Sequence, residues 1–334
     1  MDSKSSQLLS LDAKAEKWPL KSPFRITGHV WDALEVVRVS VRTPDHVGHG
    51  EAAGVYYKGD TPAVILQQLQ SINTHIDKLN RRTMQALLPP GGARNALDCA
   101  LWDLESKETG QPVWQLAGLA APKPLMTTFT CGADHPENMA NVACAYTNAR
   151  AIKLKLTGEA VDADRVRAVR EARGDVWLGV DANQGFTRDF LEWLMPTLVD
   201  TRVQLIEQPF RIGSESLLSG FDSPIPLAAD ESVQVLADIS PVSVYFDVVN
   251  IKLDKCGGLT EGLEMARAAQ ELGLQVMVGN MLGTSLAMAP AFVLGQLCQV
   301  VDLDGPVFLK TDRSTSVDYT NGFISCPNGL WGGV

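Results

Sequence analysis

The sequence has no excess of basic residues, because its 29 lysines and arginines are outnumbered by 39 aspartates and glutamates, giving a formal net charge of −10. Nucleic acids and anionic membrane surfaces attract positively charged proteins, so we expect neither as a partner. A small-molecule substrate is favoured instead. Self-association into a homo-oligomer stays open.

Other absences narrow the class of protein further. The first twenty residues contain no apolar stretch of the signal-peptide kind, and the most apolar segment, 281–297, is interrupted by polar residues, which predicts a buried helix rather than a membrane span. The six cysteines form no C-x-x-C pair, which favours a cytoplasmic protein with free thiols and makes Cys131 a buried, inert thiol. No histidine follows His135, which argues against a histidine-rich zinc site.

What the sequence does contain is a repeated alternation of strand and helix patterns. Eight short apolar runs after residue 120 are separated by amphipathic helical segments, in units of about 25 residues, as in a parallel (β/α)₈ TIM-type barrel. We therefore predict an α/β fold with three parts: an α+β capping domain (1–120), the barrel (121–305) and a C-terminal segment that returns to the cap (306–334). The runs begin at residues 127, 151, 177, 203, 225, 248, 275 and 300.

Polar residues interrupt five successive runs in phase with the repeat. They are spaced 26, 26, 23 and 22 residues apart, and each lies near the carboxyl end of its predicted strand. The active site of such a barrel lies at the carboxyl ends of the strands, so these side chains are expected to converge on one mouth. The five residues are Lys155, Asp181, Glu207, Asp230 and Lys252.

The three carboxylates in this set predict a metal site. One carboxylate at a strand end is often only a helix cap, but three in phase offer hard oxygen ligands that suit Mg²⁺, or alternatively Mn²⁺. The residues alone leave open which of Asp230 and Glu231 binds, because neighbouring strand residues point to opposite sides and only one can be a primary inward ligand. The residues alone also leave open which of Lys252 and Lys255 is the lysine that faces the site.

Several short motifs resemble the enolase superfamily, in its muconate-lactonizing subgroup. The resemblance extends to the cap segment "ARNALDCALWDLESKETGQPVWQLAG" and so covers nearly the whole chain. Within the subgroup, "MVGNMLGTSLAMAPA" and above all "VDLDGP" (301–306) are similar to the dipeptide epimerases. The superfamily motifs are "KLK" (153–155), "VDAN" (180–183), "IEQP" (206–209), "ADES" (229–232) and "NIKLDKCGG" (250–258).

The resemblance implies a role for each residue of the predicted site. Asp181, Glu207 and Asp230 would hold Mg²⁺, while two catalytic lysines would lie on opposite sides of the substrate α-carbon. The family pattern selects Lys252. Lys255 falls beyond the apolar run, in the loop before Gly257, and is expected to be a solvated or loop-stabilising lysine. Lys153, next to Lys155 on one face of its strand, would raise the local positive potential and lower the pKa of the base.

Substrate contacts are also implied by the resemblance. Two aspartates on the eighth strand would bind the α-ammonium group of a dipeptide. The segment 24–33 would close over the barrel mouth and read the substrate side chain, and it carries a histidine where Ala-Glu epimerases have an arginine. The implied substrate-binding residues are Asp302, Asp304, Thr130, Asn183, His29 and Arg25.

The implied activity is a Mg²⁺-dependent dipeptide epimerase that works by two-base 1,1-proton transfer at the carbon α to the terminal carboxylate. An alternative with the same chemistry is a racemase of N-acyl amino acids such as N-acetylglutamate. A cycloisomerase or dehydratase is disfavoured, since neither needs an ammonium-binding D-x-D. A non-catalytic barrel is disfavoured by the complete set of two lysines and three carboxylates.

Overall fold

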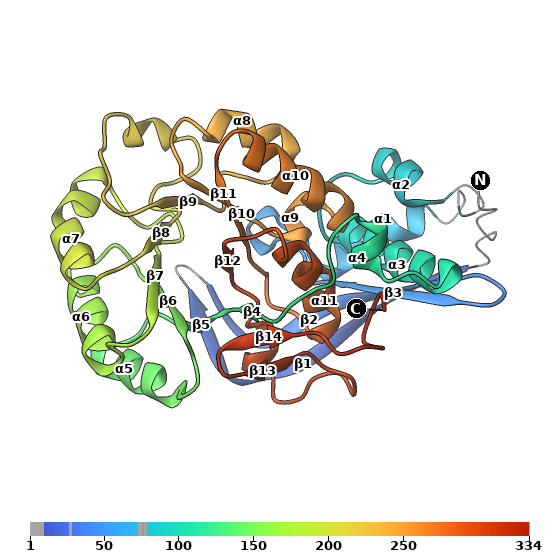
Figure 1. Ribbon diagram of the computed structural model, residues 1–334, viewed down its shortest axis with the longest axis horizontal. Helices are drawn as coiled ribbons and strands as arrows, with labels where there is room; N and C mark the ends of the chain where they lie inside the picture. Colours follow the sequence, from blue (N-terminus) through green and yellow to red (C-terminus); the bar gives the residue numbers. More distant parts are fainter. Residues whose placement is uncertain (1–9, 27–28, 73–75, 77–78, 334) are drawn as a thin grey trace.

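The computed structural model describes residues 10–26, 29–72, 76 and 79–333, and it shows a capping layer packed beside a barrel (Figure 1). The cap sheet is antiparallel, in the order β1 (Ser10–Ile26), β2 (His29–Arg42) and β3 (Val47–Ala52). Its helices are α1 (Pro62–Ser71), α2 (Arg81–Leu87), α3 (Gly92–Thr109) and α4 (Val113–Leu116).

One face of the cap sheet packs on α3. Alternate β2 residues Val37, Val39 and Val41 are fully buried there, as the period-2 pattern of a half-buried strand predicts. On β3, a Cβ atom at Gly50 would overlap the carbonyl oxygen of Ala96 on α3, so only glycine allows this approach. The predicted loop 24–33 is instead the end of the β1–β2 hairpin, in which Arg25 pairs with Val30 along the backbone.

The barrel sheet contains eight parallel strands in sequential order, which confirms the predicted fold class. Helices cover its outside (Figure 1): α5 (Pro136–Ala145), α6 (Asp162–Ala172), α7 (Arg188–Asp200), α8 (Ile239–Val242), α10 (Leu259–Glu271) and α11 (Ser285–Gly295). The strands are β5 (Thr128–Cys131), β6 (Ala151–Lys155), β7 (Trp177–Asp181), β8 (Leu205–Glu207), β9 (Leu227–Ala229), β10 (Val248–Ile251), β11 (Gln275–Val278) and β12 (Val300–Val301).

The predicted buried helix within 281–297 is α11, and nearly all of its residues are buried. All six cysteines are free thiols, and burial raises the pKa of Cys131 to about 12, as expected for an inert side chain. Among the described residues, no helix is both long and apolar enough to cross a membrane.

The C-terminal segment returns to the cap, as predicted. Its strands β13 (Asp318–Thr320) and β14 (Phe323–Ser325) pair with each other and with β4 (Leu125–Met126) at the foot of the barrel. Beyond them, the buried Trp331 indole donates hydrogen bonds to the carbonyl oxygens of His49 (2.9 Å) and Cys99 (3.1 Å). These contacts fasten the end of the chain to β3 and α3.

A charged cluster joins the same segment to the cap. The Arg313 guanidinium lies 2.5 Å from Glu51 on β3 and 2.7 Å from Glu16 on β1, and its Nε donates to Thr284 at 2.9 Å. Glu51 is almost completely buried, and burial raises its pKa despite the nearby arginine. The arginine therefore compensates a carboxylate that has no access to water.

We expect Arg313→Met to lower the free energy of unfolding by about 3 kcal/mol, because it leaves the buried Glu51 without a counter-ion. Urea unfolding followed by circular dichroism measures the change. Arg313→Met combined with Glu51→Gln should lose less, since the uncompensated charge is then gone, and Lys310→Met is the control on an exposed lysine of the same segment. Equal losses in the single and double variants would contradict this account.

Candidate active site

The five in-phase residues meet at the carboxyl ends of the barrel strands. Lys155, Asp181 and Glu207 are register partners on adjacent strands β6, β7 and β8, so their side chains line up across the sheet. Asp230 directly follows β9, and Lys252 directly follows β10. The repeated strand–helix unit thus brings together, in the folded chain, residues that are up to 97 positions apart in the sequence.

Asp181, Glu207 and Asp230 form a buried carboxylate triad. One oxygen from each lies within 4.8 Å of the others, and all three side chains are almost completely buried. Burial and repulsion from Asp181 raise the pKa of Glu207 to about 7. Three converging carboxylates cost free energy unless a cation shares them, so the donor set fits a divalent metal ion with a preference for oxygen ligands.

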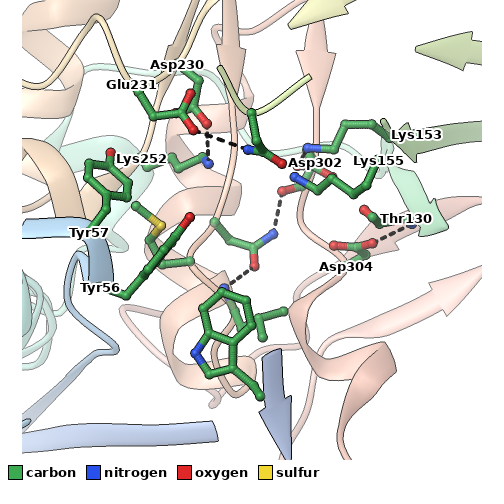
Figure 2. A pocket seen from close by; sticks show the side chains of 15 residues that line it. Tyr56, Tyr57, Thr130, Lys153, Lys155, Asp230, Glu231, Lys252, Asp302 and Asp304 are labelled. Atoms are coloured by element: carbon green, nitrogen blue, oxygen red, sulfur yellow. Dashed lines mark hydrogen bonds and ion pairs between the residues drawn. The ribbon is translucent and has the colours of Figure 1, made fainter. Parts of the chain in front are cut away.

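The two candidate catalytic lysines reach the triad from opposite sides of the pocket (Figure 2). The Lys155 Nζ lies 2.5 Å from Asp181, and the Lys252 Nζ lies 2.6 Å from Asp230. Burial alone would lower the pKa of Lys252, but the Asp230 charge raises it above its usual value. A group placed between the two ammonium nitrogens would be within reach of a proton on either face.

Lys153 differs from its expected electrostatic role. It forms an ion pair with Asp302 and lies 3.3 Å from Glu207 and 3.8 Å from Asp181. Burial opposes its charge, but Asp302 and the other carboxylates raise its pKa well above the ordinary value. Because Lys153 is paired with three acids, it balances their negative charge instead of acting as an isolated positive neighbour of Lys155.

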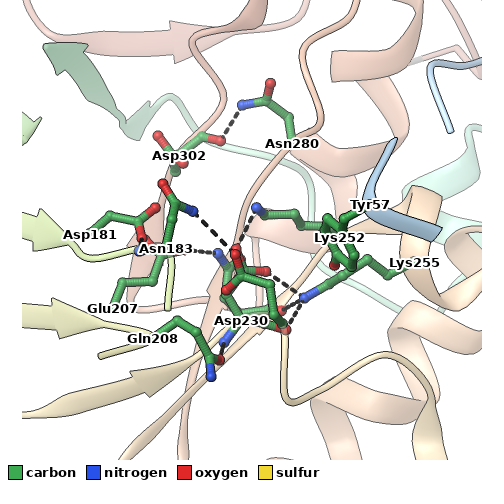
Figure 3. A network of polar contacts seen from close by, with 12 residues as sticks. Tyr57, Asp181, Asn183, Glu207, Gln208, Asp230, Lys252, Lys255, Asn280 and Asp302 are labelled. Atoms are coloured by element: carbon green, nitrogen blue, oxygen red, sulfur yellow. Dashed lines mark hydrogen bonds and ion pairs between the residues drawn. The ribbon is translucent and has the colours of Figure 1, made fainter. Parts of the chain in front are cut away.

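Of the two roles expected for Lys255, solvated or loop-stabilising, the solvated one is wrong. Lys255 lies in the short helix α9 (Leu253–Cys256), its side chain is completely buried, and its Nζ is 2.6 Å from Asp230 Oδ1 (Figure 3). It also donates to the carbonyl oxygens of Asp230 (2.5 Å) and Asn250 (3.0 Å). Lys255 therefore holds one oxygen of Asp230 while Lys252 contacts the other, and the two lysines keep the Asp230 pKa low against the effect of burial.

Asp230, and not Glu231, belongs to the carboxylate triad, but Glu231 also faces the pocket. Both line the pocket, because β9 ends at Ala229 and strand alternation no longer applies beyond it. Burial and repulsion from Asp230 raise the pKa of Glu231 to about 8. Asn183, one of the expected substrate-binding residues, also lines the pocket and donates from Nδ2 to Glu231 Oε1 at 3.2 Å.

The two aspartates of the D-x-D motif lie just beyond β12 and bridge it to β5. Asp302 accepts a hydrogen bond from the Thr128 hydroxyl (2.5 Å), and Asp304 accepts one from the Thr130 backbone amide (2.7 Å). Both carboxylates and Thr130 also line the pocket. Burial and the Asp302 charge raise the pKa of Asp304 to about 6. The motif thus joins the first and last strands of the barrel, a structural role that the sequence did not indicate.

The remaining walls of the pocket include aromatic and apolar residues from the cap and the β11–α11 loop. Trp31 and Tyr56 make an edge-to-face contact with ring centroids 5.0 Å apart, and Tyr57 packs on Tyr56. The volume at the mouth is about 60 Å³. Further lining residues carry no signal in the sequence that assigns them to the site, although the last three belong to the "GNML" part of one motif: Tyr56, Tyr57, Asn280, Met281 and Leu282. The side chains of Arg25 and His29 lie outside the described residues.

A single carboxylate fastens the aromatic wall to the barrel. Asp254 Oδ1 accepts hydrogen bonds from the backbone amides of Ala53 (3.0 Å) and Gly54 (2.8 Å), just before the turn η1 (Tyr56–Lys58). Asp254 is two residues from Lys252 in sequence, and burial raises its pKa to about 7. The cap segment and the end of β10 are therefore held in one arrangement.

Two family models match consecutive parts of the chain. The Mandelate racemase / muconate lactonizing enzyme, N-terminal domain matches residues 10–118, and Enolase C-terminal domain-like matches residues 138–330. The chain belongs to the enolase superfamily. The resemblance seen in the sequence motifs is confirmed.

Individual relatives of this enolase-superfamily member are dipeptide epimerases and a racemase. It is 36% identical to L-Ala-D/L-Glu epimerase of Escherichia coli K12 over 310 residues, covering 92% of this chain and 96% of the relative. It is 40% identical to N-acetyl-D-glutamate racemase of a Pseudoalteromonas species over 248 residues, covering 74% and 78%.

A solved structure agrees with the same assignment. An enolase family member from Agrobacterium tumefaciens, described as having homology to dipeptide epimerases and as bound to sodium and L-Ala-L-Glu, superposes with a TM-score of 0.93. The two sequences are 35% identical, and the match covers 96% of this chain and 99% of the other. This superfamily member therefore shares its whole architecture with a protein that binds a dipeptide.

Proposed function

We propose that this protein is a dipeptide epimerase that inverts the carbon α to the terminal carboxylate. The observation that carries the proposal is the placement of Lys155 and Lys252 on opposite sides of one pocket, each beside a carboxylate of the triad. Inversion requires a proton to leave one face of the carbon and another to arrive on the opposite face. Two lysines placed in this way match that requirement.

Asp181, Glu207 and Asp230 would hold the metal ion, with Mg²⁺ as the proposed cofactor and Mn²⁺ as the alternative. A bound Mg²⁺ would neutralise the negative charge that builds up on the substrate carboxylate as the α-proton leaves. A dipeptide epimerase from Enterococcus faecalis, 28% identical, has been solved with Mg and L-Leu-L-Tyr, which supports this choice.

The proton transfer assigns one lysine to each face. The neutral amine of one lysine takes the α-proton as the C–H bond breaks, and the ammonium group of the other donates a proton to the opposite face. The charges of the two lysines are then exchanged, and the reverse reaction uses them in the opposite roles. Lys153 would offset part of the negative charge of the carboxylates that it contacts, Glu207 and Asp302. Asp304, with Thr130 beside it, would receive the substrate α-ammonium group.

One observation favours the second candidate, an N-acyl amino acid racemase with the same two lysines. Asp302 is already paired with Lys153 and Thr128, which leaves Asp304 as the acid of the motif that forms no ion pair among the described residues. A substrate without an ammonium group would need less negative charge there. The similarity to N-acetyl-D-glutamate racemase points the same way.

A deuterium-exchange screen separates the two candidates. The protein is incubated in D₂O with Mg²⁺ and a library of free dipeptides and N-acetyl amino acids, and mass spectrometry detects one-unit gains at the α-carbon. We expect exchange in free dipeptides that requires both lysines. Exchange in N-acetyl amino acids alone would favour the racemase, and exchange in neither class would refute both.

A further inference from the structure

The backbone around Asp230, the last residue of the carboxylate triad, is held by one neighbouring side chain. The Asp230 amide donates to the Gln208 side-chain oxygen at 2.9 Å, and the Ser232 amide donates to the same oxygen at 3.0 Å. Gln208 is completely buried and directly follows Glu207, another residue of the triad (Figure 3). A single oxygen atom therefore fixes the backbone on both sides of Glu231.

The amide nitrogen of Gln208 is used as fully as its oxygen. Nε2 donates to the carbonyl oxygen of Phe210 and to the hydroxyl oxygen of Ser232, both at 2.8 Å. This buried amide thus accepts two hydrogen bonds and donates two, which is all that its chemistry allows. The backbone φ of Gln208 is 37°, a value that residues other than glycine rarely adopt, so these contacts stabilise an unfavourable backbone conformation.

The hydrogen bonds continue from Ser232 to an acid outside the pocket. The Ser232 hydroxyl donates to Glu215 Oε1 at 2.6 Å, and Glu215 is the first residue of the turn η3 (Glu215–Leu218). The same oxygen accepts from the Gly213 backbone amide at 3.0 Å. Partial burial opposes the charge of Glu215, but the hydrogen bond from Ser232 lowers its pKa. None of the sequence motifs described above contains Glu215.

The charge of Glu215 sets the direction of every hydrogen bond in this chain. An ionised carboxylate can only accept, so the Ser232 hydroxyl must donate to it and can offer only a lone pair to Gln208. Gln208 then turns its nitrogen towards Ser232 and its oxygen towards the Asp230 amide. The contacts of the Gln208 oxygen and nitrogen are therefore consistent with the charge at the far end of the chain.

We propose that Glu215 is a positioning residue, which acts through Ser232 and Gln208 on the backbone of Asp230 and so strengthens the binding of Mg²⁺ by the triad. The inference rests on the proposed function, which assigns Mg²⁺ to these carboxylates. Groups that hydrogen-bond to metal ligands change the metal affinity by about 10–100-fold when they are removed. Glu215 acts from two hydrogen bonds further away, so we expect a smaller effect from it.

Glu215→Ala should weaken Mg²⁺ binding about three- to tenfold, because it leaves the Ser232 hydroxyl without its acceptor. Glu215→Gln removes the same charge but keeps an oxygen that accepts from Ser232, so its affinity should stay within about twofold of the native value, since a distant charge is screened. Titration calorimetry with Mg²⁺ measures each affinity independently of activity. Circular dichroism checks that each variant folds.

Ser232→Ala interrupts the same chain one step nearer to Gln208 and is the second variant. It should weaken Mg²⁺ binding at least as much as Glu215→Ala, and the double variant should bind as weakly as Ser232→Ala alone, because both substitutions act through one chain. Asp222→Ala is the matched control, since Asp222 is an exposed acid of the same loop, and it should leave the affinity unchanged.

Native Mg²⁺ affinity in the folded alanine variants would overturn the inference, as would equal losses in Glu215→Ala and Glu215→Gln, which would indicate an effect of charge alone. Additive losses in the double variant would also contradict it. The expected affinities in a protein that shows no exchange in the screen above would support the inference and refute the proposed reaction. A native protein that binds no Mg²⁺ would refute the metal assignment, and the inference with it.

Discussion

Lys155→Ala and Lys252→Ala are each expected to reduce epimerisation by about 10³-fold or more, since each removes the lysine proposed to act on one face of the substrate α-carbon. Each variant should nevertheless retain slow exchange of the α-proton of one enantiomer, because the remaining lysine can take and return a proton on its own side. The two variants should therefore prefer opposite enantiomers. Exchange of each enantiomer in D₂O, followed by nuclear magnetic resonance, measures this directly.

Lys123→Ala is the control, because Lys123 is an exposed lysine far from the lining of the pocket. The same stereochemical preference in both variants would contradict a two-base arrangement. Normal epimerisation by Lys252→Ala with none by Lys255→Ala would show that the wrong lysine of the pair was assigned to proton transfer.

Asp230→Asn is expected to weaken Mg²⁺ binding at least tenfold and to abolish turnover. The substitution removes one of three negative ligands, and it also leaves the buried amines of Lys252 and Lys255 without their shared carboxylate. Titration calorimetry with Mg²⁺ gives the affinity independently of activity. Asp318→Asn, on an exposed strand residue, is the matched control and should bind the ion as the native protein does.

Full activity of Asp230→Asn, or of the native protein in excess EDTA, would refute the metal assignment. Loss of activity with unchanged Mg²⁺ affinity would instead indicate that Asp230 orients the two lysines and does not bind the ion. Circular dichroism of the variant is needed in either case, because two uncompensated buried ammonium groups also lower the stability of the fold.

The barrel and the main site residues were predictable because they depend on periodicity. A (β/α) unit returns the chain to the same rim at nearly constant intervals, so Asp181, Glu207 and Asp230 could be placed together without any tertiary information. The hydrophobic runs likewise identified all eight barrel strands. The positions of these carboxylates could be predicted because they follow from one local pattern that repeats along the chain.

Other features depend on where a strand ends or on which separate segments meet. Glu231 faces the pocket because β9 ends two residues earlier, and Lys255 is buried because a short helix turns its amine back to Asp230. The pairing of Lys153 with Asp302 joins β6 to the end of β12 across 149 residues. The aromatic wall at Tyr56 and Tyr57 comes from the cap. Contacts between segments that are distant in the sequence cannot be predicted from its periodicity.

The link between Asp254 and the cap has a consequence for how new substrate preferences could arise in this protein. Asp254 holds the cap segment through the main-chain amides of Ala53 and Gly54, not through the side chains that face the pocket. Tyr56 and Tyr57 can therefore be exchanged by mutation while the backbone that presents them keeps its path. Directed evolution limited to these two positions would vary the wall of the pocket and leave in place the neighbouring Lys252, the lysine proposed to transfer a proton.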